Sequence, residues 1–168
     1  MGELIMGKGS YGDIIRRGVG NTITVGNYCS IAEGCVFDGG FGHNTKFVTT
    51  YPLNAKIRGC YHLTGHPVCK GDIMIGNDVW LGEGCMIMSG ITIGDGAVVG
   101  ARSIVTKNLL PYTMSVGSPA KTYKKRFTDE QIEKLLCIKW WDWDDKKIIH
   151  NAHLLMSEDI DLFISAHS

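Results

Sequence analysis

The chain has 168 residues, enough for one domain with a buried core and room for an appendage. Its 17 lysines and arginines balance 17 aspartates and glutamates, and no basic stripe marks a nucleic-acid or membrane-surface partner. No apolar run approaches the roughly 20 residues of a membrane span, and the N-terminal segment lacks the basic and apolar regions of a signal peptide, so we expect a cytoplasmic protein.

Large apolar residues recur every six positions early in the chain. Val25, Ile31 and Phe37 share this register, and a fainter six-residue unit begins at Met6. The six cysteines form no C-x-x-C pair, and three of them, Cys29, Cys35 and Cys85, lie four positions after an aliphatic residue of the register. We therefore expect these three to be small core residues in a reducing compartment, not disulfide partners or zinc ligands.

The register is interrupted from about residue 38 to residue 74. This excursion is rich in glycine, histidine and aromatic residues and is too long for a routine turn. Loops of this length in compact folds are usually functional or disordered, and we interpret this one as functional. Its three histidines, His43, His62 and His66, leave a metal site open as an alternative.

The six-residue register resumes after the excursion and runs to residue 108. Its large aliphatic members, four of which precede a glycine, are Ile75, Leu81, Ile87, Ile93, Val99 and Val105. Four positions after each of the first five members stands a second residue of the repeat: Val79, Cys85, Ile91, Ala97 and Ser103. The pattern predicts short strands joined by tight turns, each pointing one large side chain inward. Three hexads close one triangular coil, and successive coils stack by parallel pairing.

The pattern changes after the last repeat. The residues that mark the change are Pro111, Pro119, Thr128, Gln131, Asp144 and Ser157. Thr128 and Gln131 predict a helix cap, a second helix is expected near Asp144, and a third after Ser157. We therefore expect a β-helix domain over residues 1–110 and a mostly helical C-terminal extension over residues 111–168.

The stretch GDIMIGNDVWLGEGCMIMSGITIGDGAVVGARSIVTK and the later RFTDEQIEKLLCIKWWDW resemble the hexapeptide-repeat acyltransferases. Within that family they are similar to the xenobiotic acetyltransferase branch, which holds chloramphenicol and streptogramin acetyltransferases and polysaccharide O-acetyltransferases. The resemblance covers roughly residues 25–143. It implies a mainly β fold, the left-handed parallel β-helix, with one long excursion loop. It also implies a homotrimer with sites between subunits and acetyl-CoA as the acetyl donor, without a metal.

The resemblance implies a catalytic role for His43. The segment GGFGHNTKFVTTYPL lies where the family has G-x-x-x-H-R followed by S-T-[YF]-P-F, with Asn44 and Leu53 departing from that pattern. A histidine suits the role because imidazole is a general base near neutral pH. The expected reaction is a direct transfer with both substrates bound. The acceptor-binding residues expected nearby are Tyr51, Asn44, His66 and Asp38.

By the same resemblance, coenzyme A is expected along the outside of the coils between two subunits. The residues expected near its pantetheine arm are Trp80, Gly82, Glu83, Gly100, Ala101, Thr106 and Lys107. The residues expected at its phosphates, where cationic side chains suit dense negative charge, are Lys121, Lys124 and Arg126.

The acceptor expected from the sequence is a sugar hydroxyl, as in surface polysaccharide biosynthesis. Antibiotic-modifying members usually carry a longer insertion before the segment matching VGNYCS, whereas GDIIRRGVGNTIT is short here. Three alternatives stay open: N-acetylation of an amino sugar, acetylation of chloramphenicol or a streptogramin, and a non-catalytic β-helical assembly subunit. Metal catalysis is disfavoured, because the γ-class carbonic anhydrases place their ligands on the helix faces, whereas these three histidines lie together in the excursion.

Overall fold

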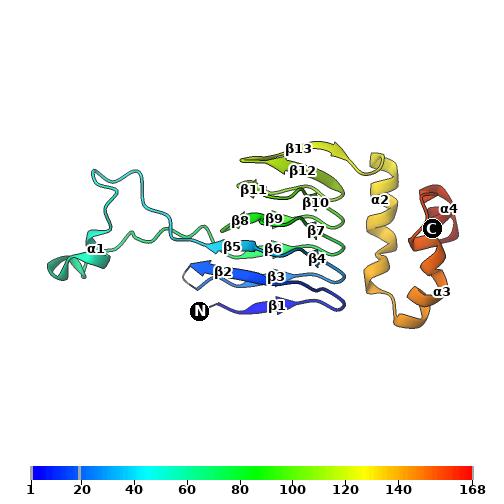
Figure 1. Ribbon diagram of the computed structural model, residues 1–168, viewed down its shortest axis with the longest axis horizontal. Helices are drawn as coiled ribbons and strands as arrows, with labels where there is room; N and C mark the ends of the chain where they lie inside the picture. The colour runs from blue at the N-terminus through cyan, green and yellow to red at the C-terminus, as the bar shows by residue number, and fades with distance from the viewer. Residues whose placement is uncertain (1, 19, 168) are drawn as a thin grey trace.

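The computed structural model describes residues 2–18 and 20–167 as a stack of short strands, with an arm on one side of the stack and helices on the opposite side (Figure 1). One sheet contains β1 (Leu4–Met6), β3 (Ile23–Val25), β6 (Ile73–Ile75) and β9 (Thr92–Ile93). The second contains β4 (Ser30–Ile31), β7 (Trp80–Leu81), β10 (Val98–Val99), β12 (Thr113–Gly117) and β13 (Ala120–Lys125). The third contains β2 (Ile14–Gly18), β5 (Cys35–Gly39), β8 (Met86–Met88) and β11 (Ile104–Val105). Apart from β13, the strands of these three sheets pair in parallel, as in a left-handed β-helix.

The six-residue register explains why the coils form. Leu81, Ile87 and Ile93 take successive places in the repeat, fall on three different sheets and are each 0% exposed. One large aliphatic side chain per strand therefore fills the interior, while the residue before it, Trp80, Met86 or Thr92, is exposed or half-buried. The prediction of stacked triangular coils is confirmed. Cys29, Cys35 and Cys85 are also 0% exposed free thiols inside the stack, as expected for small core residues.

The stack begins in the N-terminal segment, where the repeat is only faint, and extends beyond residue 110. Near the N-terminus, β1 pairs with β3, an isolated bridge joins Tyr11 to Ser30, and β2 pairs with β5. Residues 4–18 thus form a coil of their own, and the segment GDIIRRG is part of the solenoid. At the other end, β12 pairs parallel with β10 beyond residue 110, and β13 returns antiparallel to β12.

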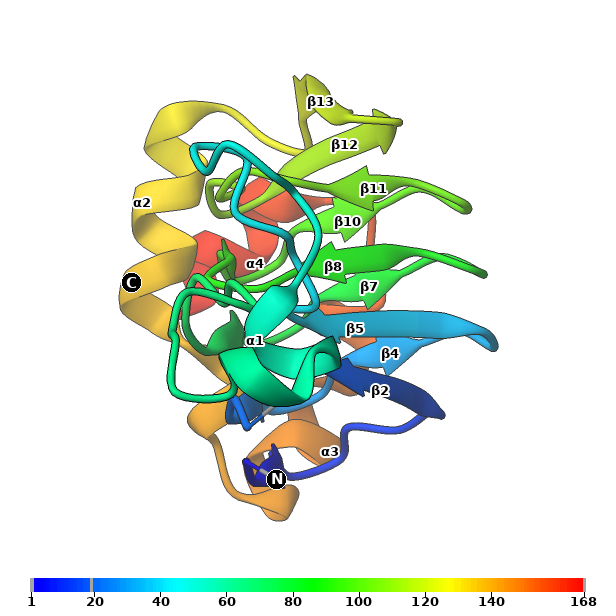
Figure 2. The same cartoon turned by 90° about the vertical axis from the view of Figure 1, so that its left-hand side faces the viewer.

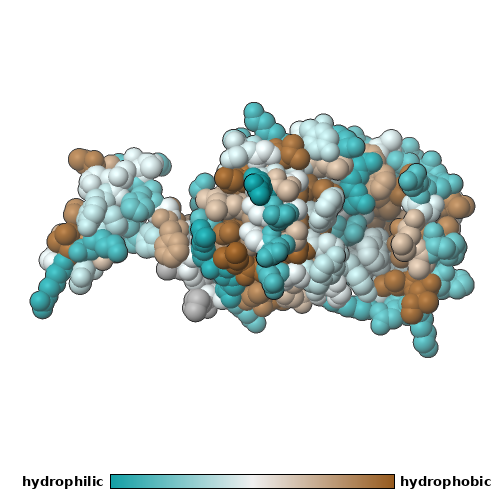
Figure 3. All heavy atoms as spheres, in the orientation of Figure 1, coloured by the Kyte–Doolittle hydropathy of each residue, from teal (hydrophilic) through white to brown (hydrophobic). Residues whose placement is uncertain are grey.

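The excursion forms an arm between β5 and β6 that projects away from the coils; Figure 2 is viewed from the arm's side. It contains α1 (Leu53–Lys56) and a 3₁₀ turn, η1 (Arg58–Cys60), and an antiparallel bridge between Gly42 and Val68 closes its base. No residue from 41 to 72 is buried. The arm leaves large apolar side chains exposed, some visible as brown patches in Figure 3: Phe41, Phe47, Val48, Tyr51, Leu53, Ile57, Tyr61 and Leu63.

Three helices and a 3₁₀ turn lie along the side of the coil stack opposite the arm: α2 (Asp129–Ile138), η2 (Trp140–Asp142), α3 (Asp145–Leu155) and α4 (Ile160–His167). Their apolar faces form a second core around Leu135, Trp141 and Phe163, separate from the core inside the coils. The expected caps are present, since Thr128 begins α2 and Asp144 begins α3. Within the described residues, no helix is long and apolar enough to cross a membrane.

We expect Thr128→Ala to lower the free energy of unfolding by about 1 kcal/mol. The Thr128 side chain accepts a hydrogen bond from the Gln131 N–H at 3.3 Å, and the Gln131 side chain accepts one from the Thr128 N–H at 3.1 Å. The alanine variant loses the half of this reciprocal cap that the threonine hydroxyl supplies, while its backbone N–H can still donate to the Gln131 side chain. Urea unfolding measures the change, and Thr92→Ala, at an exposed threonine of β9, is the matched control. Equal losses in the two variants would show that the cap contributes nothing.

Candidate active site

His43 lies near the base of the arm, where its side chain is exposed. Its Nδ1 forms a short hydrogen bond with the backbone carbonyl of Thr50. Because a carbonyl oxygen only accepts, Nδ1 must carry the proton in this contact. The neutral imidazole then keeps its lone pair on Nε2, which is the state that a general base requires.

His66 and Asn44 lie directly beside His43. The His43 and His66 rings meet edge to face with centroids 5.4 Å apart, and the Asn44 backbone N–H donates to His66 Nδ1 at 3.2 Å. The Asn54 side chain in α1 donates to the His66 carbonyl at 2.9 Å. Residues from both halves of the arm therefore meet at one point, and two of the expected acceptor residues adjoin His43.

The other two expected acceptor residues are placed differently. Tyr51 follows Thr50 on the exposed surface of the arm, with half of its area accessible. Asp38 lies in β5 inside the coil stack, and its carboxylate accepts a hydrogen bond from the Gly40 N–H at 2.9 Å. Asp38 thus stabilises the turn where the arm leaves the coil, which is an ordinary role for aspartate in turns.

The three histidines of the arm do not gather into a metal site. Among residues 2–18 and 20–167, no group of three or more His, Cys, Asp and Glu side chains is placed to hold a metal ion. His43 and His66 adjoin each other, whereas His62 is exposed just after η1. The metal site of three histidines that the sequence left open is therefore not formed among these residues.

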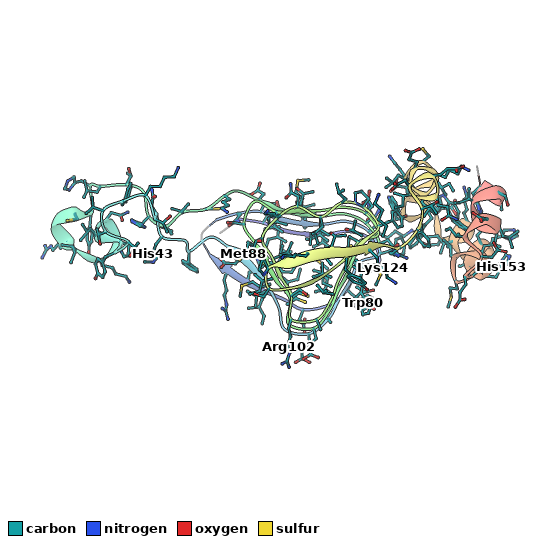
Figure 4. All side chains as sticks on the ribbon, turned by 90° about the horizontal axis from the view of Figure 1, so that it is seen from above. His43, Trp80, Met88, Arg102, Lys124 and His153 are labelled. Carbon is teal, nitrogen blue, oxygen red and sulfur yellow. The ribbon has the colours of Figure 1, made fainter. Side chains whose placement is uncertain are left out.

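The expected donor-binding residues occupy two different corners of the triangular coil (Figure 4). Gly82, Glu83, Gly100 and Ala101 follow β7 and β10 at the corner that Arg102 marks, and Trp80 projects from the adjoining sheet with 53% of its area exposed. Thr106 and Lys107 follow β11, at the corner from which the arm departs. One chain therefore does not bring all of these residues to one place.

The two glycines at the first corner are required by coil stacking. A Cβ on Gly82 would lie 2.6 Å from the backbone nitrogen of Ala101, and a Cβ on Gly100 would lie 2.6 Å from Val116 Cγ1. Each missing side chain lets the next coil approach closely. The outer rim of this corner is formed by Glu83 and Ala101, which are exposed.

Arg126 lies apart from Lys121 and Lys124, the two lysines that were expected to bind the coenzyme A phosphates together with it. Lys121 and Lys124 are exposed on β13, whereas the Arg126 guanidinium donates to the Gly96 carbonyl at 2.7 Å and pairs with Asp78 at 3.4 Å. Burial raises the pKa of Asp78, and the charge of Arg126 opposes that rise. The guanidinium also stacks over Tyr112 and Phe127 in a cavity of about 330 Å³ beneath the helices.

Two contacts at the site had no signal in the sequence. The hydrogen bond that fixes the His43 tautomer comes from a backbone carbonyl, which any residue at position 50 supplies. The Asn44 contact with His66 likewise uses a backbone N–H. The only signal in the sequence for these contacts was that His43 and His66 lie in the same excursion.

Comparison with known sequences places the chain in a family. Residues 72–107 match the family described as "Bacterial transferase hexapeptide (six repeats)". The chain is 44% identical to a probable macrolide acetyltransferase of Lysinibacillus sphaericus, over 83% of this chain and 80% of the relative. It is 39% identical to a chloramphenicol acetyltransferase of Agrobacterium fabrum, over 82% of this chain and 68% of that relative.

Solved structures agree with the sequence relatives. A hexapeptide-repeat acetyltransferase from Vibrio cholerae is similar with a TM-score of 0.61 and 25% identity, covering 74% of this chain and 64% of the other. A maltose O-acetyltransferase from Clostridium difficile is similar with a TM-score of 0.54 and 29% identity, covering 74% of this chain and 60% of the other. The chain thus belongs to the xenobiotic acetyltransferase branch of the hexapeptide-repeat acetyltransferases, a family that takes its acetyl group from acetyl-CoA.

Proposed function

We propose that this enzyme transfers the acetyl group of acetyl-CoA to a hydroxyl group of an antibiotic, with a macrolide as the first candidate and chloramphenicol as the second. The observation that carries the proposal is the 44% identity to a probable macrolide acetyltransferase across 80% of its length. Chloramphenicol acetyltransferases follow at 38–41% identity, each matched over 68% of its length. These relatives favour the antibiotic alternative over the sugar acceptor expected from the sequence.

The chemistry of the arm supports the same choice. Between Asp38 and Asp72 the sequence contains no aspartate or glutamate, and the arm exposes eight large apolar side chains, four of them aromatic. A sugar site would use polar and acidic side chains for its many hydroxyls, whereas a largely apolar acceptor suits apolar walls with a few polar groups. The short connection before residue 25 no longer favours a sugar acceptor, because it includes β2, a strand of the solenoid that pairs with β5.

His43 is the proposed general base. With Nδ1–H held by the Thr50 carbonyl, Nε2 takes the proton of the acceptor hydroxyl as its oxygen attacks the thioester carbonyl. The new C–O bond forms, the C–S bond breaks, and the proton passes to the departing thiolate, giving an ester and coenzyme A. No acyl-enzyme is required when both substrates are held together.

The coil corner of a second subunit is the proposed donor wall. Trp80, Glu83 and Ala101 lie at or beside a corner from which the arm of the same chain points away (Figure 4). An arm that carries His43 but no buried residue needs an external surface to pack against, and the exposed apolar side chains listed above suit such packing. We therefore propose a homotrimer in which the arm of one subunit meets the corner of the next.

The residues proposed to hold coenzyme A are Trp80, Gly82, Glu83, Gly100, Ala101, Thr106, Lys107, Lys121 and Lys124. Thr106 and Lys107 share a corner with the arm, so in the trimer they would approach the donor from the subunit that supplies His43. Lys121 and Lys124 are exposed cations suited to the phosphates. Arg126 is left out, because its guanidinium is engaged by Asp78 and Gly96.

We expect a macrolide or chloramphenicol to release coenzyme A thiol from acetyl-CoA at a rate at least about 100-fold above the rate without acceptor, as expected for acid–base catalysis. The measurement is thiol release with a panel of macrolides, chloramphenicol, streptogramins, sugars and amino sugars. Mass spectrometry of the product then locates the added acetyl group. Turnover of sugars alone would overturn the proposal and restore the sugar acceptor.

A further inference from the structure

His66 is held in the arm by contacts that leave one ring nitrogen in a defined state. Its Nδ1 accepts the Asn44 backbone N–H at 3.2 Å, so the neutral ring carries its proton on Nε2. That Nε2 is buried and has no hydrogen-bond partner in the part of the chain that the structure describes. A buried donor without a partner is unfavourable, so the hydrogen bond of the other ring nitrogen is the polar contact that favours this placement of the ring.

The Asn44 amide is the backbone group that immediately follows His43. Fixing it restricts the backbone on the C-terminal side of His43, while the Thr50 carbonyl restricts the imidazole itself. The His66 ring also contacts the His43 ring directly, with centroids 5.4 Å apart and planes at 67°. His66 therefore touches both the side chain and the backbone that set where His43 points.

The surroundings of His66 hold it in this place. Phe47 packs edge-on against the ring with centroids 5.4 Å apart, and the Asn54 side chain donates to the His66 carbonyl at 2.9 Å. The titratable group that faces the ring is His43; Phe47, Asn44 and Asn54 carry no charge. These contacts join the two halves of an arm that has no buried core of its own.

We propose that His66 is a positioning residue for His43, acting through the hydrogen bond that its unprotonated Nδ1 accepts from the Asn44 amide. The inference rests on the proposed function of His43 as the general base. Protonation of His66 places a second proton on Nδ1, which then repels the Asn44 N–H instead of accepting it. Protonation of His66 thus removes the contact that fixes the backbone beside His43, while the Thr50 carbonyl still holds the imidazole.

Two variants test this. In His66→Asn the amide oxygen replaces Nδ1 as an acceptor without titrating, and in His66→Ala no acceptor remains. We expect His66→Ala to lower kcat with the antibiotic acceptor by about 10- to 100-fold, since small misplacements of a catalytic group cost that much. The KM for acetyl-CoA stays within about twofold of wild type, because the donor wall is on the coils. His66→Asn keeps kcat within about threefold and has a less steep acid limb in its pH profile, set by one proton instead of two.

Nuclear magnetic resonance provides a readout that needs no acceptor. In a His43→Ala background, which removes the neighbouring imidazole, the Asn44 amide proton is expected to shift with pH and to stay constant when His66→Asn is added. A wild-type kcat in His66→Ala, equal losses in the two variants, or an Asn44 amide that responds to pH alike in His43→Ala with and without His66→Asn would each overturn the inference. If no antibiotic is acetylated but the Asn44 amide behaves as expected, the proposed acceptor is wrong and the positioning contact stands.

Discussion

His43→Ala is expected to lower kcat/KM for the antibiotic acceptor by about 10²- to 10⁴-fold, the usual contribution of a general base. The acceptor hydroxyl would have no group to take its proton, since the neighbouring His66 directs its unprotonated nitrogen to the Asn44 amide. The measurement is coenzyme A thiol release at saturating acetyl-CoA. Because His43 is exposed and lies outside both hydrophobic cores, its removal should leave the unfolding midpoint unchanged.

His62→Ala is the matched control for this prediction. His62 is an exposed histidine on the same arm, and its ring stands outside the contacts that join His43, His66 and Phe47. Its alanine variant should keep the wild-type rate. If His43→Ala and His62→Ala are equally active, the general base is a different group and the proposed mechanism fails.

The coils could be predicted from the sequence because their burial depends on local periodicity. Leu81, Ile87 and Ile93 are each buried by the place they take in a six-residue repeat. The first coil, which lies within the expected domain of residues 1–110, had only a faint hexad at Met6 as its signal, because Ile14 and Ile15 do not continue the repeat; β2 is recognised by its pairing with β5. Pairing between strands is a property of the folded chain, which a faint repeat does not reveal.

The site was less predictable than the coils, because it depends on contacts between distant segments. Lys124 and Arg126 are two residues apart, yet Arg126 turns under the helices to meet Asp78, 48 positions earlier in the chain. Charge patterning cannot distinguish the two residues, since the difference arises from how the C-terminal helices fold back on the coils. The sequence located the arm and His43, but what holds His43 in place is a backbone carbonyl and a neighbouring imidazole.

Two inactive variants are expected to restore each other when they are co-expressed. His43→Ala disables the arm, and Ala101→Trp places an indole on the exposed rim of the proposed donor wall without entering the coil core. We expect each variant alone to lose at least about 100-fold in activity. If each site pairs the arm of one subunit with the corner of the next, random mixing gives about one quarter of the sites an intact arm and an intact wall.

The recovered rate therefore decides where the site lies. Thiol release near a quarter of the wild-type rate requires arm and wall to come from different subunits, since every chain in the mixture carries one defect. A site built within one chain would recover nothing, whatever the oligomeric state. Co-expression of His43→Ala with His43→Gln is the control, because both defects then lie on the arm and no combination restores a site. Full activity of Ala101→Trp alone would instead show that the donor does not pass this corner, and the proposed coenzyme A position would be wrong.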